Sequence, residues 1–181
     1  MFDVIITGGT LIDGTGSPRR RADVGIFGEK VTAIDDLSRA NARRVVNATG
    51  HVVSPGLIDS HVHSDGVLLS DPQHANGLRQ GVTTEILGQD GLSYAPLSQE
   101  NYRIYRRYLV GILGSPPEDL DMSSVKSFRS HYHKKTAINT AYLVPHGAIR
   151  LETVGFEDVP MRGEALEKAR KLVRQGMDDG A

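Results

Sequence analysis

Two histidines separated by a single residue, His61 and His63, are the side chains of this sequence best suited to hold a metal ion. The apolar residues 57–58 just before them predict a buried strand that begins at a Pro-Gly turn. Because side chains on a strand alternate between its faces, both imidazoles would project from the same side. Imidazole nitrogen suits zinc and other divalent metals. The spacing therefore predicts a metal site; the alternative is a chance His-x-His pair among the seven histidines of the chain.

The composition is that of an ordinary globular protein. Its 181 residues suffice for one large domain, or for a small domain and part of another. Acidic and basic residues nearly cancel, which leaves a formal net charge of -1, and the basic run at residues 19–21 is most simply a solvated turn. We therefore expect no nucleic-acid partner and no membrane partner.

The absence of cysteine excludes disulfides and thiolate metal ligands within this sequence. The first residues carry an acid at Asp3, and their apolar run is too short for a signal peptide. No apolar stretch reaches the length of a membrane span. These features predict a cytoplasmic protein.

Residues 1–54 predict a small antiparallel β unit, because their apolar runs are short and separated by glycine-containing turns. Residues 24–27 and 31–34 flank such a turn and predict a hairpin. Residues 44–48 and 51–53 predict a second pair across a Thr-Gly turn.

From residue 55 onward, strand-like and helix-like stretches alternate. After the His-x-His strand, the pattern predicts helices over 71–80, 99–113, 123–135 and 162–179, and strands over 82–87 and 138–144. Tyrosines at helical spacing in the second helix, Tyr102, Tyr105 and Tyr108, predict a packing surface. The alternation predicts a parallel sheet with right-handed crossovers, as in a (β/α) barrel whose active site lies at the carboxyl ends of the strands.

Four polar side chains fall at those strand ends: His61, His63, Asp90 and His146. Asp90 lies between glycines in the turn after the second strand, and His146 lies in the turn 144–150 after the third. Asp90 is either a metal ligand or an Asx-turn residue.

Together with the β unit, the stretch Pro-Gly-Leu-Ile-Asp-Ser-His-Val-His-Ser-Asp at residues 55–65 resembles the metal-dependent amidohydrolase superfamily. The turns at 88–96 and 144–150 and the segment 177–181 look like its N-acyl-D-amino-acid deacylase (D-aminoacylase) branch. The resemblance implies the first part of a TIM-type (β/α)8 barrel, residues 55–181, preceded by a small β-sandwich-like unit, residues 1–54. Both would be incomplete, because three parallel strands cannot close an eight-stranded barrel. We therefore expect an N-terminal fragment that self-associates through exposed barrel edges.

The resemblance also implies a site and a reaction. His61 and His63 would bind one or two divalent metal ions, in the first place zinc, and Asp90 stands where the best-known D-aminoacylases have a cysteine ligand. The implied activity is hydrolysis of the linear amide of a small N-acyl-D-amino acid, with a general base beyond Ala181. His146 and Arg150 would line the substrate side, Arg150 by pairing with the substrate carboxylate; a structural histidine and a surface arginine are the alternatives.

Two other functions stay open at this stage. A cyclic-amide hydrolase of the hydantoinase or dihydroorotase kind shares His-x-His, and it usually uses a carboxylated lysine on a later strand. Alternatively, the 181-residue chain is a non-catalytic truncated product. For the chain by itself we expect weak or no metal binding and no turnover.

Overall fold

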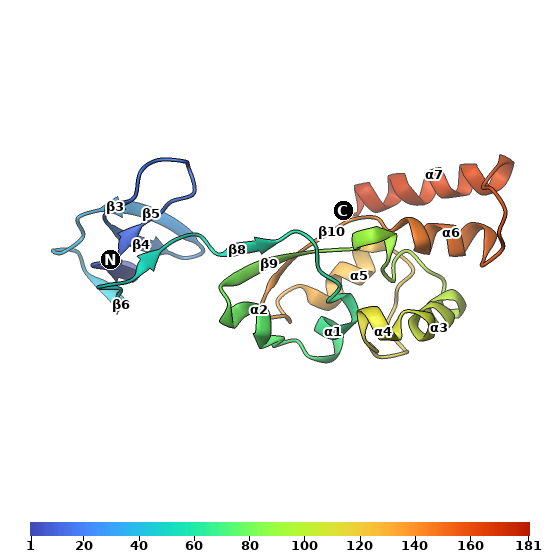
Figure 1. Cartoon of the computed structure of the whole chain (residues 1–181), viewed down its shortest axis with the longest axis horizontal. Helices are drawn as coiled ribbons and strands as arrows, with labels where there is room; N and C mark the ends of the chain where they lie inside the picture. Colours follow the sequence, from blue (N-terminus) through green and yellow to red (C-terminus); the bar gives the residue numbers. More distant parts are fainter. The chain divides into compact units, whose positions relative to one another are not determined.

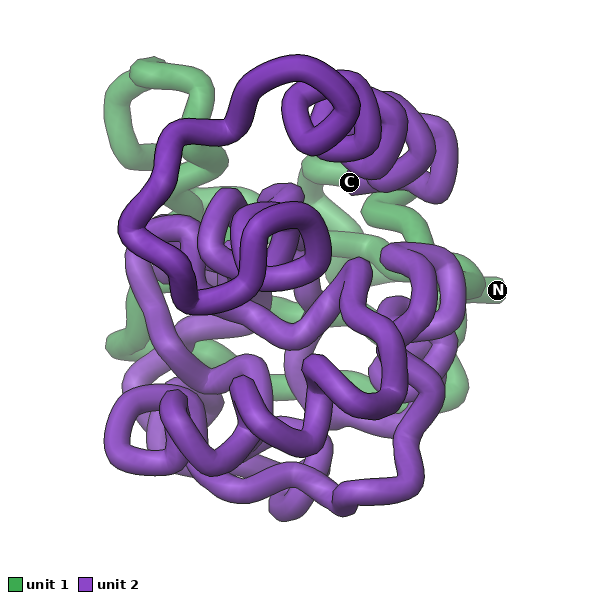
Figure 2. The backbone as a smooth tube through the Cα atoms, turned by 90° about the vertical axis from the view of Figure 1, so that its right-hand side faces the viewer, with its two compact units in different colours: residues 1–55 green, residues 56–181 purple.

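The structure, a computed structural model, describes residues 1–181 and divides them into two compact units. Unit 1 comprises residues 1–55 and unit 2 comprises residues 56–181 (Figure 2). No helix in either unit is both long and apolar enough to span a membrane.

Unit 1 consists of strands in two small sheets (Figure 1). The larger sheet has the order β5-β4-β1-β6, with β1 at Phe2–Thr7, β4 at Asp23–Phe27, β5 at Lys30–Asp35 and β6 at Ala42–Asn47. The smaller has the order β3-β2-β7, with β2 at Thr10–Leu11, β3 at Arg20–Arg21 and β7 at Val52–Val53. Ile5, Leu11 and Val24 are buried within this unit.

The hairpin predicted around Gly28 is confirmed, since β4 and β5 pair antiparallel on either side of it. The second predicted pair is wrong: β6 pairs parallel with β1, and β7 pairs parallel with β2. A turn in which the His51 amide donates to the Ala48 carbonyl directs the two strands into different sheets. The unit is therefore mixed rather than purely antiparallel.

Unit 2 is built on a three-stranded parallel sheet of order β10-β9-β8, which confirms the predicted parallel arrangement. Its strands are β8 at Leu57–Asp59, β9 at Val82–Leu87 and β10 at Asn139–Tyr142. Between β8 and β9 come two short helices, α1 at Asp65–Ser70 and α2 at Ala75–Arg79, which lie on one side of these strands (Figure 1). After β9 come the turn η1 at Gln89–Gly91 and the helices α3 at Gln99–Tyr108, α4 at Val110–Leu113 and α5 at Val125–Tyr132.

Strand β8 is shorter and more exposed than the sequence predicts. It ends at Asp59, before the histidines, and Leu57 and Ile58 are 58% and 64% exposed. The prediction of a buried strand is wrong because β8 is an edge strand with only β9 beside it.

The helices differ from their predictions in several places. The single helix expected over 99–113 is divided at Leu109 into α3 and α4. The helix expected over 71–80 begins only at Ala75, because the Asp71 carboxylate accepts the Gln73 amide in a local turn. Helix α6 at His146–Val154 replaces the turn expected at 144–150, so His146 is a helical residue. Helix α7, Gly163–Asp178, agrees with its prediction within a residue.

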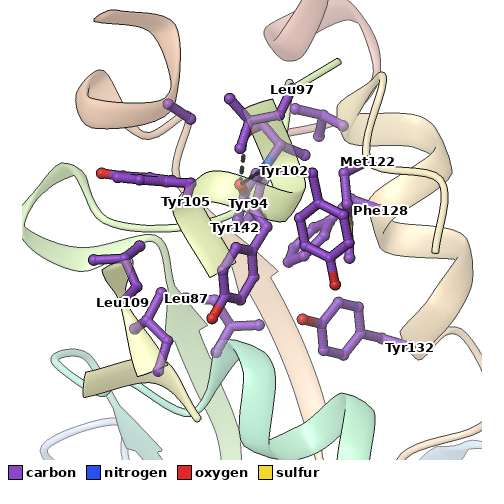
Figure 3. Packing of buried hydrophobic residues seen from close by; sticks show 14 of the residues in the cluster. Leu87, Tyr94, Leu97, Tyr102, Tyr105, Leu109, Met122, Phe128, Tyr132 and Tyr142 are labelled. Carbon is purple, nitrogen blue, oxygen red and sulfur yellow. Dashed lines mark hydrogen bonds between the residues drawn. The ribbon is translucent and has the colours of Figure 1, made fainter. Parts of the chain in front are cut away.

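An aromatic core fills the space between the sheet of unit 2 and its helices (Figure 3). Phe128 is fully buried, and its ring centroid lies 4.9 Å from that of Tyr132 and 4.6 Å from that of Tyr142. The two hydroxyl groups are satisfied, since Tyr132 donates to the Asp65 carbonyl at 2.6 Å and Tyr142 to the Ala95 carbonyl at 2.7 Å. The core thus ties α5 and β10 to the segments that follow β8 and β9.

The predicted tyrosine packing surface on α3 is confirmed for two of its three members. Tyr102 and Tyr105 are buried, whereas Tyr108 is 68% exposed; its ring stacks on Tyr105 and lies tilted against Phe156. On α7, Ala169 is buried, whereas Val173 and Met177 are exposed.

Candidate metal site

His61 and His63 lie in the segment after β8, not on the strand itself. The Asp59 carboxylate accepts the His61 amide at 3.1 Å and holds the chain as it leaves the strand. The two imidazole rings are 5.6 Å apart and nearly perpendicular. Strand alternation is therefore not what brings the rings together; a turn fixed by Asp59 begins the segment that carries them.

Asp90 reaches the same place from the turn after β9. Its backbone φ of 55° is in the left-handed region, and the flanking residues Gly88 and Gly91 also have positive φ. Aspartate tolerates this conformation better than most residues, and such strain is common at functional sites. The partners of its carboxylate are the two histidines rather than a backbone amide, so the structure does not form the Asx turn that was the alternative for Asp90.

The three side chains converge on one point. Asp90 Oδ2 lies 3.3 Å from His61 Nε2 and 3.1 Å from His63 Nε2, and all three ligand atoms are within 4.8 Å of one another. Tetrahedral zinc, with bonds of about 2.0–2.2 Å, holds its ligand atoms about 3.3–3.5 Å apart. The donor set therefore suits a zinc ion, and the two distances to Asp90 are close to this spacing. His61 and Asp90 are more than half exposed, which leaves the point open to a small molecule.

A buried carboxylate, Asp65, follows His63 by two residues. It has no exposed surface, and its Oδ1 accepts the Ser93 hydroxyl at 2.6 Å and the Gly88 amide at 3.1 Å. Burial raises the pKa of Asp65 to about 6, and these hydrogen bonds partly oppose the shift. Asp65 thereby joins the His-x-His segment to the turn that carries Asp90.

A second buried carboxylate, Glu85, supports the same segment from β9. Its Oε2 accepts the hydroxyl of Ser64, the residue after His63. Its Oε1 lies 4.0 Å from His74 Nε2 at the start of α2. Both carboxylates therefore attach the metal-site segment to the neighbouring strand and its turn.

The structure brings His146 beside the site but gives Arg150 other partners. A Cβ atom added at Gly91 would lie 3.3 Å from His146 Cβ, so the first residue of α6 borders the Asp90 turn. One turn later, Arg150 Nη2 donates to the carbonyls of Glu157 and Val159, the latter at 2.8 Å. Their roles in binding a substrate stay predictions.

Sequence reasoning missed the supporting roles of Asp65, Ser93 and Glu85. Asp65 had a usable signal, because it is an acid in the same short stretch as the His-x-His pair. Ser93 and Glu85 gave none, since their partners are 28 and 21 residues away along the chain.

Gly88 is the residue of the Asp90 turn that tolerates substitution least. Its φ is +82°, and an added Cβ would lie 2.4 Å from the Leu143 carbonyl oxygen. Gly88→Ala is expected to destabilise the protein by more than about 2 kcal/mol, because left-handed strain adds to a clash with backbone. Urea unfolding measures the change. Gly111→Ala is the control, since no atom lies within 4 Å of an added Cβ there; an equal loss in both variants would refute the explanation.

Comparison with known proteins shows the family to which this chain belongs. The sequence profile of the Amidohydrolase family matches residues 44–177, which is most of the chain. The chain therefore belongs to the amidohydrolase family, and the resemblance seen in its motifs is confirmed.

Relatives that match nearly the whole chain include deacylases. The chain is 35% identical over 190 residues to D-aminoacylase and 40% identical over 180 residues to N-acyl-D-glutamate deacylase, both of Alcaligenes xylosoxydans xylosoxydans. Each match covers 99% of this chain and 36% of the relative. The chain thus spans about a third of the length of these proteins.

Solved structures of deacylases are also similar to this chain. A D-aminoacylase structure from work on its binuclear metal center matches with a TM-score of 0.88 and 33% identity, over 100% of this chain and 37% of that one. N-acyl-D-glutamate deacylase from Bordetella bronchiseptica, complexed with zinc and a phosphonate inhibitor, matches with a TM-score of 0.83 and 31% identity, over 98% and 36% of the two chains. The mixed α/β fold is therefore that of D-aminoacylase structures.

Proposed function

We propose that the complete protein is a zinc-dependent hydrolase that cleaves the amide bond of small N-acyl-D-amino acids, releasing a D-amino acid and a carboxylate. The observation that carries the proposal is the convergence of His61, His63 and Asp90 on one open point. The names of the deacylase relatives support the choice of substrate.

In this proposal residues 55–181 contribute the first strands and helices of a (β/α)8 barrel, and residues 1–54 contribute part of a β-sandwich-like unit. The parallel order β10-β9-β8 supports the barrel, as does the position of the site beyond the carboxyl ends of β8 and β9.

The chemistry divides between the metal and the side chains. A bound zinc ion supplies Lewis-acid polarisation of the amide carbonyl and lowers the pKa of a water molecule. His61 and His63 donate neutral Nε2 lone pairs, and the Asp90 carboxylate offsets part of the metal's charge. The exposed edge of the site, formed by His61 and Asp90, faces the incoming amide. The general base is expected outside residues 1–181, as the family resemblance implies.

A substrate panel tests this function. The complete protein, loaded with zinc, is assayed on N-acetyl-D- and N-acetyl-L-amino acids, hydantoin and dihydroorotate. We expect release of the D-amino acid, slower or no release of the L-enantiomer, and no ring opening. Hydrolysis of the cyclic amides in preference to the D-amides would replace the proposal with a cyclic-amide hydrolase.

Arg150 is proposed to pair with the substrate carboxylate, beside its bonds to the loop at 157–159. Arg150→Ala is expected to raise the KM for N-acyl-D-amino acids about tenfold or more, because a charge-assisted hydrogen bond contributes about 1.5–3 kcal/mol. Steady-state kinetics measures the change. An unchanged KM with a lower melting temperature would assign Arg150 to the loop alone.

A further inference from the structure

Two buried polar atoms of unit 2 lack any hydrogen-bond partner: Nδ1 of His63 and Oδ2 of Asp65. Leaving a buried donor or acceptor unsatisfied costs about 1–3 kcal/mol. The two atoms belong to residues only two positions apart, and one is the natural complement of the other, since Nδ1 can carry a proton and a carboxylate oxygen accepts one.

The Asp65 side chain is held so that Oδ2 remains free. Its other oxygen, Oδ1, already accepts from the Ser93 hydroxyl and the Gly88 amide. Its backbone carbonyl accepts from the Tyr132 hydroxyl. Three groups from other segments thus fix the residue, and none of them uses Oδ2.

The imidazole of His63 has one nitrogen committed to the metal site. Nε2 lies 3.1 Å from the Asp90 carboxylate and must be unprotonated to bind a metal. In the neutral ring the proton is then on Nδ1, which needs an acceptor. A second partner of this kind commonly fixes the tautomer of a metal-bound histidine.

We infer that Asp65 is a positioning residue of the proposed metal site: its Oδ2 accepts the Nδ1 proton of His63, across one water molecule or after a small rotation of the imidazole, and so turns the Nε2 lone pair toward the metal. The same carboxylate ties His63 to the turn that carries Asp90 through Gly88 and Ser93. Asp65 therefore sets both the tautomer of one ligand and its position relative to another. The role of Asp65 in metal binding rests on the proposed function, whereas the hydrogen bond between Asp65 and His63 does not.

The hydrogen bond can be read directly in the complete, zinc-loaded protein, in which Nε2 binds the metal and the proton is on Nδ1. NMR of ¹⁵N-labelled histidine is expected to show the Nδ1 proton of His63 exchanging slowly with solvent. In Asp65→Asn, the amide keeps an oxygen for Ser93 and Gly88 but presents NH₂ in place of Oδ2, so this proton is expected to exchange faster. An Nδ1 proton that exchanges equally fast in wild type and variant would overturn the inference.

Metal affinity supplies the second readout. Competition with a chelator is expected to show zinc binding about 10–100-fold weaker in Asp65→Asn, the usual effect of removing such a partner. Asp121→Asn is the matched control: Asp121 makes comparable bonds, to the Ser127 hydroxyl and the Ser123 amide, at the start of α5. Zinc binding is expected to be unchanged there.

The outcomes separate the two proposals. Equal zinc affinity in wild type and a folded Asp65→Asn protein would refute the role of Asp65 and leave the function standing. The expected protection of the Nδ1 proton together with failure to cleave N-acyl-D-amino acids would refute the function and leave the hydrogen bond standing.

Discussion

Replacing His63 by alanine in the complete protein is expected to lower kcat/KM for an N-acyl-D-amino acid by about 10³-fold or more. Metal catalysis contributes several kcal/mol to transition-state stabilisation, and each loss of about 1.4 kcal/mol costs a factor of about ten. His63 is the less exposed of the two histidines, and its Nε2 makes the shorter approach to Asp90. Steady-state kinetics and zinc content, measured on the same preparation, check the prediction.

His133→Ala is the control for this substitution, since His133 is an exposed residue that follows α5. It should leave zinc content and rate unchanged. A His63→Ala protein that keeps its zinc and its rate would show that the ligands lie elsewhere.

Phe128→Ala is expected to destabilise the protein by about 3–5 kcal/mol, the range found for large aromatic residues in cores. Phe128 is fully buried and contacts the rings of Tyr132 and Tyr142. Because Tyr132 also bonds to the backbone of Asp65, the loosened core would disturb the metal site as well. Urea unfolding followed by circular dichroism gives the change in free energy.

Phe156→Ala provides the comparison for Phe128→Ala. Phe156 is 59% exposed and meets only the rings of Tyr105 and Tyr108, so we expect a loss of at most about 1.5 kcal/mol. If both substitutions lower the free energy of unfolding equally, the core of unit 2 is not where the structure places it.

The sequence predicts the parallel sheet of unit 2 and the group His61, His63 and Asp90. The reason is physical: parallel strands end at one edge, so residues that follow successive strands meet there. The local explanation was nevertheless wrong for the histidines, which lie in the segment that begins with the Asp59 turn.

The errors have a common cause in contacts between distant segments. The segments β6 and β7 look like a hairpin locally, but β1 and β2 compete for them as parallel partners. Helix α6 begins with His146 and Gly147, poor helix formers, and is stabilised by packing against α7 and the Asp90 turn. Local propensity does not reveal such tertiary partners.

The most direct test of the central claim is a crystal structure of the complete protein with zinc, recorded with anomalous scattering at the zinc absorption edge. We predict an anomalous peak about 2.0–2.2 Å from Nε2 of His61, Nε2 of His63 and a carboxylate oxygen of Asp90, the distances expected for zinc ligands. A zinc-loaded, active protein whose peak lies away from these three atoms would contradict the account.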